Sequence, residues 1–460
     1  MKLCVLGGTG ARSAFLTKSL VTNAKSINVD HIVLMDCNQQ HLHTYGEIAK
    51  GIAARLRPDL LFECTDSAEY ALKDADYIIT TIRAGGDEGR CFDEKECLKR
   101  GILGQETTGA GGFAMAIRSI PTLIRYCSLA RKIAHPSHLI FNFTNPSGVI
   151  TQALRSQGFN NVYGICDAPS GFIKQLEEIL GVSYGSLAIE CYGLNHLSWF
   201  RNARLKGESV QEQLLNDPRV YQYSEMRLFT RDMARISGDE MLNEYLYFYY
   251  RHNRSLGMVE KAEHPRGEMI YLINKEIEKQ LAKLSFPDDF EKGFDIYMNG
   301  YGKRENAYFS VESGSRRKKT WIPPKLDEFL QSPDEGGYAA VALKFIKAIT
   351  ENKPCRMILS VPNRGAITGL ADDDVIEITC DIDTDGAHPI HIGRIDDFQL
   401  EQIRRIKYFE RCTVSAIIDD NPDYAIKGLM LHPLVNDFEI AKELTEVFFE
   451  HYSEYIHMND

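Results

Sequence analysis

The sequence lacks the features that attach a protein to a membrane or to nucleic acid. No apolar run approaches the roughly 18 residues that a bilayer-spanning helix needs, and no secretory signal precedes the first apolar stretch, so we expect a cytoplasmic location. Acidic residues (64) outnumber Lys and Arg (53), and the formal net charge is −11. The basic run at 316–319 is expected to be a solvated surface cluster. Neither nucleic acid nor a membrane is therefore expected as a partner.

Paired or regularly spaced cysteines are also absent. The eleven cysteines are scattered without a Cys-x-x-Cys pair, which favours buried thiols in a reducing compartment over a disulfide framework. The chain has no internal repeat and no low-complexity segment. Its 460 residues, 44% of them hydrophobic, can bury a large core and form two domains. The function must then be sought in local motifs that bind small ligands.

The amino-terminal segment has the pattern of a dinucleotide-binding turn. Residues 2–6 read as a short apolar strand, and Gly7, Gly8 and Gly10 stand between it and a helical stretch. Glycines in this place let backbone N–H groups approach a pyrophosphate at the helix N-terminus. The third glycine of the usual fingerprint is replaced by Ser13. We predict that the three glycines bind the cofactor.

A carboxylate closes the second apolar run, residues 31–36. Asp36 stands at the end of this predicted strand, where an acid would bind the two ribose hydroxyls of a nucleotide. An acid there also repels a 2′-phosphate, so NAD is favoured over NADP. The alternative is that Asp36 only caps a turn.

Three further apolar runs alternate with helical segments, which is typical of a parallel sheet covered on both faces. Ligands of such sheets bind at the carboxyl ends of the strands, so the polar side chains there are candidate site residues. The runs are residues 76–86, 137–148 and 161–166, and the side chains are Arg83, Asn142, Asn145, Cys166 and Asp167. Arg83 is assigned to the cofactor.

The pattern changes after about residue 190. Helical periods appear at 223–236 and 267–284, strand signals return at 356–363 and 374–382, and amphipathic helices close the chain. We predict an α/β protein with a Rossmann-like doubly wound domain over residues 1–190, of the lactate/malate dehydrogenase type. Residues 191–460 would form an α+β substrate domain, to which the family resemblance given below adds metal and oligomer contacts.

One cysteine and one histidine follow the nucleotide-binding segment in positions that suit a metal. Cys166 ends a predicted strand, and His196 stands in 193-GLNHLSW-199. A thiolate and an imidazole suit a borderline transition metal better than magnesium or calcium. Two protein ligands leave positions open for water or substrate. The alternative is a buried core thiol and a structural histidine.

Three other side chains suit the same site. Tyr245 stands four residues before Tyr249 on one predicted helical face; such a pair is often packing, but a metal can lower the pKa of a tyrosine until it acts as a base. Arg90 and Arg266 could bind an anionic group of the substrate. Their alternative is an ordinary surface ion pair.

Together these motifs resemble glycoside hydrolase family 4, whose members use NAD and a divalent metal and often act on 6-phosphorylated disaccharides. The resemblance covers most of the chain and is carried by the Gly7–Gly10 turn and by several longer stretches. These are 102-ILGQETTGAGGFAMAIRSIP-121, 141-FNFTNPSG-148, 164-GICDAP-169, 193-GLNHLSW-199, 243-NEYL-246 and 361-VPNRGAI-367.

The resemblance implies a role for each matching residue. NAD⁺ would oxidise C3 of the sugar, a base would remove the C2 proton, the glycosidic bond would be eliminated, and water addition and re-reduction would complete a net hydrolysis. A homodimer or homotetramer is also implied. The implied assignments are Cys166 and His196 as ligands of manganese, Tyr245 as base, Asp167 as acid and substrate contact, and Asn145, Arg90 and Arg266 as contacts with substrate and 6-phosphate.

The family motifs divide on the anomer. Asp167 matches the phospho-α-glucosidases, whereas 365-GAITGLADDDVIEI-378 and 430-MLHPLV-435 are closer to the phospho-β-glucosidases. We favour a 6-phospho-β-glucosidase, with the α activity as the alternative. Two arginines and an asparagine would also suit a uronate in place of the phosphate.

Two readings from other classes remain as alternatives. A 2-hydroxy-acid dehydrogenase of the same fold would form NADH without needing a metal, and the thiol of Cys166 argues against it. An NAD sensor without activity would need a docking or DNA-reading module, and no such module is recognisable.

Overall fold

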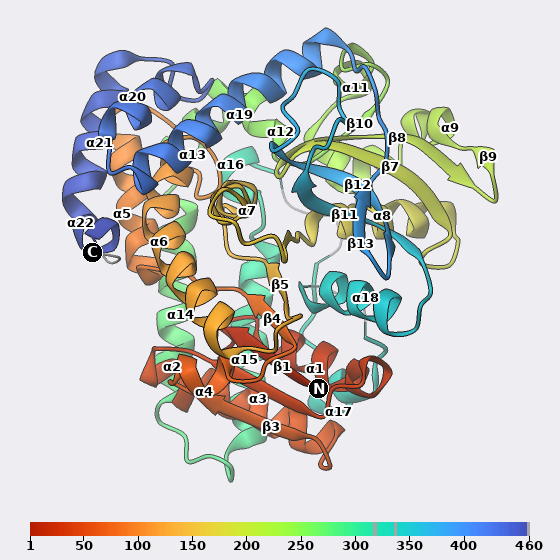
Figure 1. Ribbon diagram of the computed structural model, residues 1–460, viewed down its shortest axis with the longest axis vertical. Helices are drawn as coiled ribbons and strands as arrows, with labels where there is room; N and C mark the ends of the chain where they lie inside the picture. Colours follow the sequence, from red (N-terminus) through yellow and green to blue (C-terminus); the bar gives the residue numbers. More distant parts are fainter. Residues whose placement is uncertain (316–319, 335–337, 458–460) are drawn as a thin grey trace.

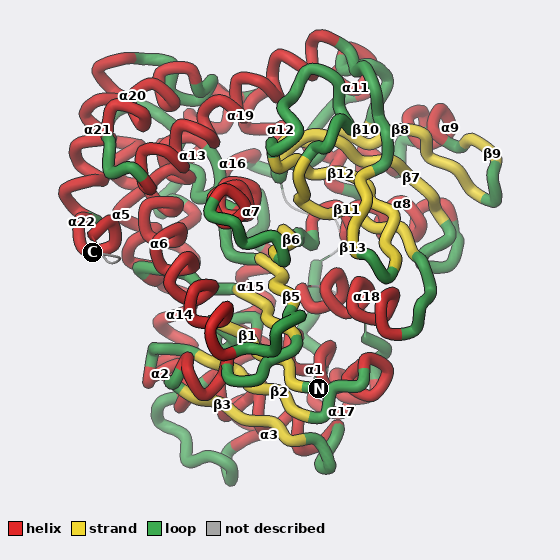
Figure 2. The backbone as a smooth tube through the Cα atoms, viewed as in Figure 1, coloured by secondary structure: helices red, strands yellow, loops and turns green. Residues whose placement is uncertain are grey.

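The computed structural model describes residues 1–315, 320–334 and 338–457. The basic run at 316–319 lies outside the described residues. Two strand systems and their covering helices make up the molecule, and the strands continue from one system into the other (Figures 1 and 2). Among the described residues, none of the helices combines the length and the apolar character that crossing a membrane requires.

The amino-terminal strands form a parallel sheet in the order β3-β2-β1-β4-β5-β6. This is the strand order of a doubly wound dinucleotide-binding fold, so the Rossmann-like prediction is confirmed. The strands are β1 (Lys2–Leu6), β2 (His31–Met35), β3 (Leu61–Thr65), β4 (Tyr77–Thr80), β5 (Leu139–Asn142) and β6 (Val162–Gly164).

One of these strands was not predicted. The sequence suggested that the third strand lies at 76–86, but β3 precedes it at the edge of the sheet. Its five residues are exposed or only half-buried, because an edge strand has a partner on one side only. A strand of this kind lacks the continuous apolar run that identifies buried parallel strands.

Helices cover both faces of the parallel sheet. They follow the strands in the α/β alternation expected from the sequence, and α6 is the longest of them with 25 residues. The helices of this half are α1 (Ser13–Asn23), η1 (Ala24–Ile27), α2 (Gln39–His43), α3 (Tyr45–Leu56), α4 (Ala68–Leu72), α5 (Gly86–Lys99), α6 (Gly109–Ile133), α7 (Ser147–Ser156) and α8 (Ala168–Leu180).

The sheet continues beyond β6 as an antiparallel system in the order β6-β11-β12-β7-β8-β10. The strands expected at 356–363 and 374–382 are the middle of this system. One sheet thus joins the two halves of the chain. The domain boundary near residue 190 stays a prediction. The strands are β7 (Leu187–Leu194), β8 (Leu197–Leu205), β9 (Glu208–Ser209), β10 (Met241–Leu242), β11 (Cys355–Pro362), β12 (Val375–Asp383) and β13 (Gly386–Pro389).

The helical period at 223–236 does not form one helix. It is divided among α10, η2 and α11, because Ser224 and Thr230 have extended backbones and their hydroxyls accept bonds from the N–H groups of Met226 and Met233. Such capping bonds start a new helix instead of continuing the old one. The pieces are α10 (Val220–Tyr223), η2 (Glu225–Leu228) and α11 (Arg231–Ile236).

The remaining helices surround the antiparallel strands and close the chain. The helix predicted at 267–284 is α14, and the predicted carboxyl-terminal helices are α19 to α22. They are α9 (Gln211–Asn216), α12 (Leu246–Tyr250), α13 (His252–Lys261), α14 (Arg266–Leu281), α15 (Phe290–Asn306), α16 (Ser310–Ser313), α17 (Leu326–Gln331), α18 (Tyr338–Thr350), α19 (Asp397–Ile418), α20 (Pro422–Leu431), α21 (Phe438–His451) and α22 (Ser453–Ile456).

A buried ion pair fixes the carboxyl-terminal helices to the nucleotide-binding half, where α21 and α22 lie beside α5 and α6 (Figure 1). Arg118 of α6 is fully buried, and its guanidinium donates to both oxygens of Asp93 at 3.0 and 2.8 Å. The hydroxyl of Tyr452 donates to the same carboxylate at 2.6 Å. Arg118 also donates to the carbonyl of Ala84, so this cluster supports a loop that lines the cleft described next.

Candidate active site

A cleft of about 840 Å³ opens at the carboxyl ends of the parallel strands and is lined by residues from both halves of the chain. Twelve of the thirteen residues that the sequence suggested for the site line this one cleft. They are Gly7, Gly8, Gly10, Asp36, Arg83, Arg90, Asn145, Cys166, Asp167, His196, Tyr245 and Arg266. The exception is Asn142, whose fully buried amide bonds with Thr80 and Thr151 instead. The individual roles of the twelve remain predictions.

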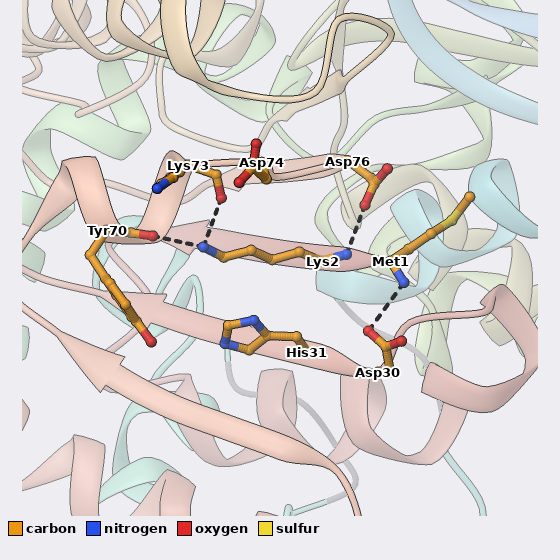
Figure 3. Close-up of a pocket in the computed structure, with 8 residues that line it drawn as sticks. All are labelled: Met1, Lys2, Asp30, His31, Tyr70, Lys73, Asp74 and Asp76. Carbon is orange, nitrogen blue, oxygen red and sulfur yellow. Dashed lines mark hydrogen bonds and ion pairs between the residues drawn. The ribbon is translucent and has the colours of Figure 1, made fainter.

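Another depression lies at the opposite, amino-terminal edge of the parallel strands (Figure 3). Its charges hold the chain terminus in place: Lys2 Nζ donates to the carbonyls of Tyr70 and Lys73 at 2.7 and 2.9 Å, and the amino group of Met1 contacts Asp30 at 3.1 Å. The charged groups of Lys2 and Met1 thus have partners within the protein. The depression therefore has a structural explanation and is not part of the cleft.

In the glycine turn between β1 and α1, Gly7 and Gly8 have no room for a side chain, whereas Gly10 does. Gly7 has a φ of +80°, and a Cβ there would lie 2.8 Å from the carbonyl of Thr81. A Cβ on Gly8 would lie 2.9 Å from the Cβ of Leu34, whereas one on Gly10 would meet nothing within 4 Å. The first two glycines allow close packing against the sheet, and the third faces open space. Such a turn fits a pyrophosphate at the N-terminus of α1.

Asp36 has contacts that fit both interpretations of it. Its Oδ1 accepts a bond from the backbone N–H of Asn38 at 3.0 Å, as in a capped turn, and its Oδ2 lies 3.8 Å from His41 Nδ1 in the cleft wall. The other ring nitrogen of His41 contacts Glu278 of α14 at 3.2 Å. Burial acts to lower the pKa of His41, but its bonds with Asp36 and Glu278 raise it to about 9. No local pattern points to this histidine, because Glu278 comes from a distant segment of the chain.

Cys166 and His196 lie next to each other. Cys166 follows β6, and His196 stands in the two-residue turn between β7 and β8 with a φ of +66°. The Sγ and Nε2 atoms are 3.7 Å apart. Metal–sulfur and metal–nitrogen bonds of ordinary length place two such ligands about 3.1 to 3.6 Å apart. The pair therefore needs only a small adjustment to share one metal.

The electrostatics of the pair also fit a metal cation. Burial lowers the pKa of His196 to about 3, so its ring is neutral and able to coordinate. Burial, followed by the carboxylates of Glu377 and Asp167, raises the pKa of Cys166 well above its ordinary value. A thiol so placed becomes a thiolate only if a cation approaches.

Cys166 and His196 stand as a pair of protein donors. In the described part of the chain no group of three or more His, Cys, Asp or Glu side chains is arranged to hold a metal. The Nδ1 atom of His196 is buried and has no hydrogen-bond partner among these residues. A metal held by this pair would take its further ligands from water or substrate.

Tyr245 lies against His196, with ring centroids 3.8 Å apart and planes that differ by 5°. Burial, followed by the charge of Glu244, raises the pKa of Tyr245 above its ordinary value. The protein alone thus makes this tyrosine a poorer base, and a cation in the cleft would have to reverse the shift. Tyr249, four residues on, bonds with Thr108 instead, so the two tyrosines belong to different environments.

Arg90 is part of a buried ion-pair network and not of a surface pair. It is 8% exposed, its Nε contacts Glu94 at 2.9 Å, and its Nη1 contacts Glu106 at 2.8 Å. Arg83 contacts the same Glu106 at 2.8 Å. Although burial acts to raise it, the two guanidinium groups lower the pKa of Glu106 below its ordinary value. Glu106 lies in the GQET stretch that carried the family resemblance, yet the sequence alone did not single it out.

Arg266 begins α14 on the other side of the cleft. Its Nη1 donates to the carbonyl of Ala307 at 2.8 Å, and its guanidinium lies over the ring of Tyr308. Its Nε is 4.0 Å from Glu312. Arg90 and Arg266, the two arginines proposed for the substrate, are therefore both held in defined positions by neighbouring groups.

Asp167, the proposed acid, is the N-cap of α8 and so stands at the start of that helix.

The doubly wound sheet and the cleft at its carboxyl edge place the protein among the Rossmann-fold enzymes. The comparison with known families is more specific. The chain belongs to glycosyl hydrolase family 4, because the family model described as "Family 4 glycosyl hydrolase" matches residues 2–182 and that described as "Family 4 glycosyl hydrolase C-terminal domain" matches residues 191–435.

Relatives along the whole chain have been assigned to both anomers. The 6-phospho-beta-glucosidase BglT of Thermotoga maritima is 27% identical over 99% of each chain. The phospho-alpha-glucosidase PagL of Clostridium acetobutylicum is 26% identical over 97% of each. A solved structure of the Thermotoga maritima 6-phospho-beta glucosidase, with manganese, NAD⁺ and glucose-6-phosphate, is 27% identical, covers 99% of both chains and has a TM-score of 0.80.

Proposed function

We propose that this protein is an NAD- and divalent-metal-dependent 6-phospho-β-glucosidase. The observation that carries the proposal is the contact of three side chains in one cleft: Cys166 Sγ lies 3.7 Å from His196 Nε2, and the His196 ring is stacked on Tyr245. Support comes from the Thermotoga maritima relative, which has this activity and whose solved structure holds manganese, NAD⁺ and glucose-6-phosphate.

The residues of the cleft divide into a cofactor end and a chemical end. Gly7, Gly8 and Gly10 would hold the pyrophosphate, Asp36 the ribose hydroxyls, and Arg83, just after the neighbouring strand β4, would stabilise the nucleotide. When bound, NAD⁺ supplies a hydride acceptor and the metal, which we take to be Mn²⁺, supplies Lewis-acid polarisation.

At the chemical end the side chains of the protein bind the sugar and move protons. Cys166 and His196 would hold the metal, and the phenolate oxygen of Tyr245, formed once a nearby cation lowers the pKa of its hydroxyl, would take the proton from C2. Asp167, at the start of α8, donates a proton to the leaving oxygen and contacts the substrate. The 6-phosphate is bound by the guanidinium groups of Arg90 and Arg266, which suit phosphate oxygens, and by the side-chain amide of Asn145. No nucleophilic carboxylate is needed, unlike in most glycosidases.

The alternative is a 6-phospho-α-glucosidase that uses the same residues. Asp167 favours it, since an acid at this position matches the α-acting members, and PagL is almost as similar to this chain as BglT is. The β assignment is supported by the segments at 365–378 and 430–435. We further propose that the protein is cytoplasmic and forms a homodimer or homotetramer.

The test is the release of nitrophenol from the α- and β-nitrophenyl glucoside 6-phosphates under reducing conditions, with NAD⁺ and Mn²⁺ added together, singly or not at all. We expect cleavage of the β-glucoside only with both additives, without net formation of NADH. Cleavage of the α-glucoside alone would establish the α activity instead. No cleavage of either would refute the hydrolase proposal, and the unphosphorylated glucosides and a nitrophenyl glucuronide show whether phosphate is required.

A further inference from the structure

Glu377 lies between the two segments that carry Cys166 and His196. It belongs to β12, in the middle of the antiparallel part of the sheet, and the sequence already shows it as an acid within an apolar strand, 375-VIEIT-379. One cross-strand row of paired residues runs through it from β6 to β8. The row is Gly164, Ser360, Glu377, Gly193 and Ser198.

This row connects the backbone of both proposed metal ligands. Cys166 follows Gly164 by two residues, and His196 follows Gly193 by three. Neither glycine has room for a side chain, because a Cβ on Gly164 would lie 2.6 Å from the Cβ of Ser360 and one on Gly193 would lie 2.2 Å from the Leu197 carbonyl. Gly164 is therefore packed tightly against β11, the strand that pairs with β12, and Gly193 against β8 of its own hairpin.

Both oxygens of the Glu377 carboxylate accept hydrogen bonds from residues of the turn that contains His196. The residue is only 2% exposed. Its Oε1 accepts a bond from Asn195 Nδ2 at 2.9 Å, and its Oε2 accepts one from Ser198 Oγ at 2.9 Å. These two donors stand immediately before and two residues after His196. One carboxylate thus holds the residues on both sides of His196.

The turn needs such support because His196 has a left-handed backbone, with a φ of +66°. A residue with a side chain is strained in this region unless its surroundings hold it there. Nothing in the described residues bonds to the Nδ1 atom of its ring. The bonds of Glu377 to the two flanking residues are then a main restraint on where His196 Nε2 points.

We propose that Glu377 is a positioning residue for the metal site, which holds the 195–198 turn so that His196 faces Cys166. Because both of its oxygens are bonded within the turn, it acts through His196 and not as a ligand. The inference rests on the proposed function, since it takes Cys166 and His196 as the ligands.

The test measures binding of Mn²⁺ alone to the purified full-length protein, from the loss of the free-ion electron paramagnetic resonance signal. Removing a group that orients a metal ligand costs about 10- to 100-fold in affinity, and we expect this loss for Glu377→Ala. Ser198→Ala removes one of the two bonds and should lose about three- to tenfold. Glu377→Gln should stay within about threefold of wild type, because its amide oxygen still accepts from Asn195 and its amide nitrogen donates to Ser198 Oγ.

Glu240, which directly precedes β10, offers a matched control beside the same hairpin. It is a largely buried carboxylate that accepts a bond from Tyr192 at 2.6 Å, and burial raises its pKa to about 7, as it does for Glu377. Glu240→Gln should bind Mn²⁺ like the wild type. With Co²⁺ in place of Mn²⁺, the thiolate-to-cobalt absorption should persist in Ser198→Ala while the ligand-field bands change, since only the histidine is displaced.

Wild-type Mn²⁺ affinity in both Glu377→Ala and Ser198→Ala would overturn the inference. An equal loss of affinity in Glu377→Gln and Glu377→Ala would also overturn it, because the negative charge of Glu377 would then matter and its bonds to the turn would not. If Glu377→Ala does not fold, Ser198→Ala and Glu377→Gln decide alone. Failure of the proposed function gives a different result, because then the wild type would bind no Mn²⁺ or would bind it equally well without Cys166.

Discussion

The ring of His196 lies flat on the ring of Tyr245, with centroids 3.8 Å apart and 5° between the planes. His196 comes from the turn between β7 and β8, and Tyr245 directly precedes α12. The contact joins a proposed metal ligand to the proposed base without any intervening residue. A change in the tyrosine can therefore be made that keeps the ring contact and removes only the chemistry.

Tyr245→Phe keeps the stacked ring and removes the hydroxyl. We expect kcat on the phosphorylated nitrophenyl glucoside to fall about 10²- to 10⁴-fold, the usual contribution of a general base. Affinity for Mn²⁺ and thermal stability should stay close to wild type, and exchange of solvent deuterium into C2 of the product should be lost. Tyr249→Phe, in the helix that follows Tyr245, should keep kcat within about threefold. Full activity in Tyr245→Phe would exclude it as the base.

Cys166→Ser tests the metal site. A hydroxyl is a much weaker donor than a thiolate toward a borderline metal, so we expect Mn²⁺ affinity to fall by at least about tenfold, measured by the resonance signal of free Mn²⁺. Cys355→Ser changes a half-buried thiol at the start of β11, five residues before the Ser360 that pairs with Gly164; it is the control and should bind normally. An unchanged affinity in Cys166→Ser would show that the thiol is only part of the core.

Asp36→Ser tests cofactor choice. Hydrogen bonds to a charged group contribute about 1.5–3 kcal/mol, so loss of the carboxylate should weaken NAD⁺ binding about 10- to 100-fold by calorimetric titration. Binding of NADP⁺ should be unchanged or improve, because the repelling charge is gone and His41 remains nearby. Asp66→Ser, at an exposed position that bonds with Gln39, should alter neither. Parallel losses for both cofactors would contradict a role in selectivity.

His41 gives the stability of the protein a defined pH dependence. Its pKa is raised to about 9, from an ordinary value of 6.5, so folding is favoured by the protonated ring. This contribution is fully present below pH 6.5 and is lost as the pH rises through 9. We expect wild type to exceed His41→Gln by on the order of 1–3 kcal/mol at pH 6 and by little at pH 10, measured by denaturant unfolding without cofactor.

The same measurement on His43→Gln supplies the control, because His43 is exposed on the same short helix and should show no such trend. A stability difference for His41→Gln that grows with pH would mean that the ring is neutral in the folded protein.

The parts of the fold that could be predicted are those in which a local pattern is sufficient. Buried parallel strands are continuous apolar runs, so β1, β2, β4, β5 and β6 were recognisable. The edge strand β3 was not, because half of its surface faces solvent. The helical period at 223–236 was read as one helix, because periodicity does not register that Ser224 and Thr230 use their side chains as caps.

The candidate site shows the same division. The sequence by itself determined which polar side chains end the strands, where the glycine turn lies and which donors could hold a metal, since each depends on residue type and a short spacing. Only the tertiary structure decided that Arg83 and Arg90 share Glu106, that His41 links Asp36 to Glu278 and that Glu377 supports His196. These contacts depend on sheet register and helix packing between segments far apart in the chain, and no local pattern encodes that pairing.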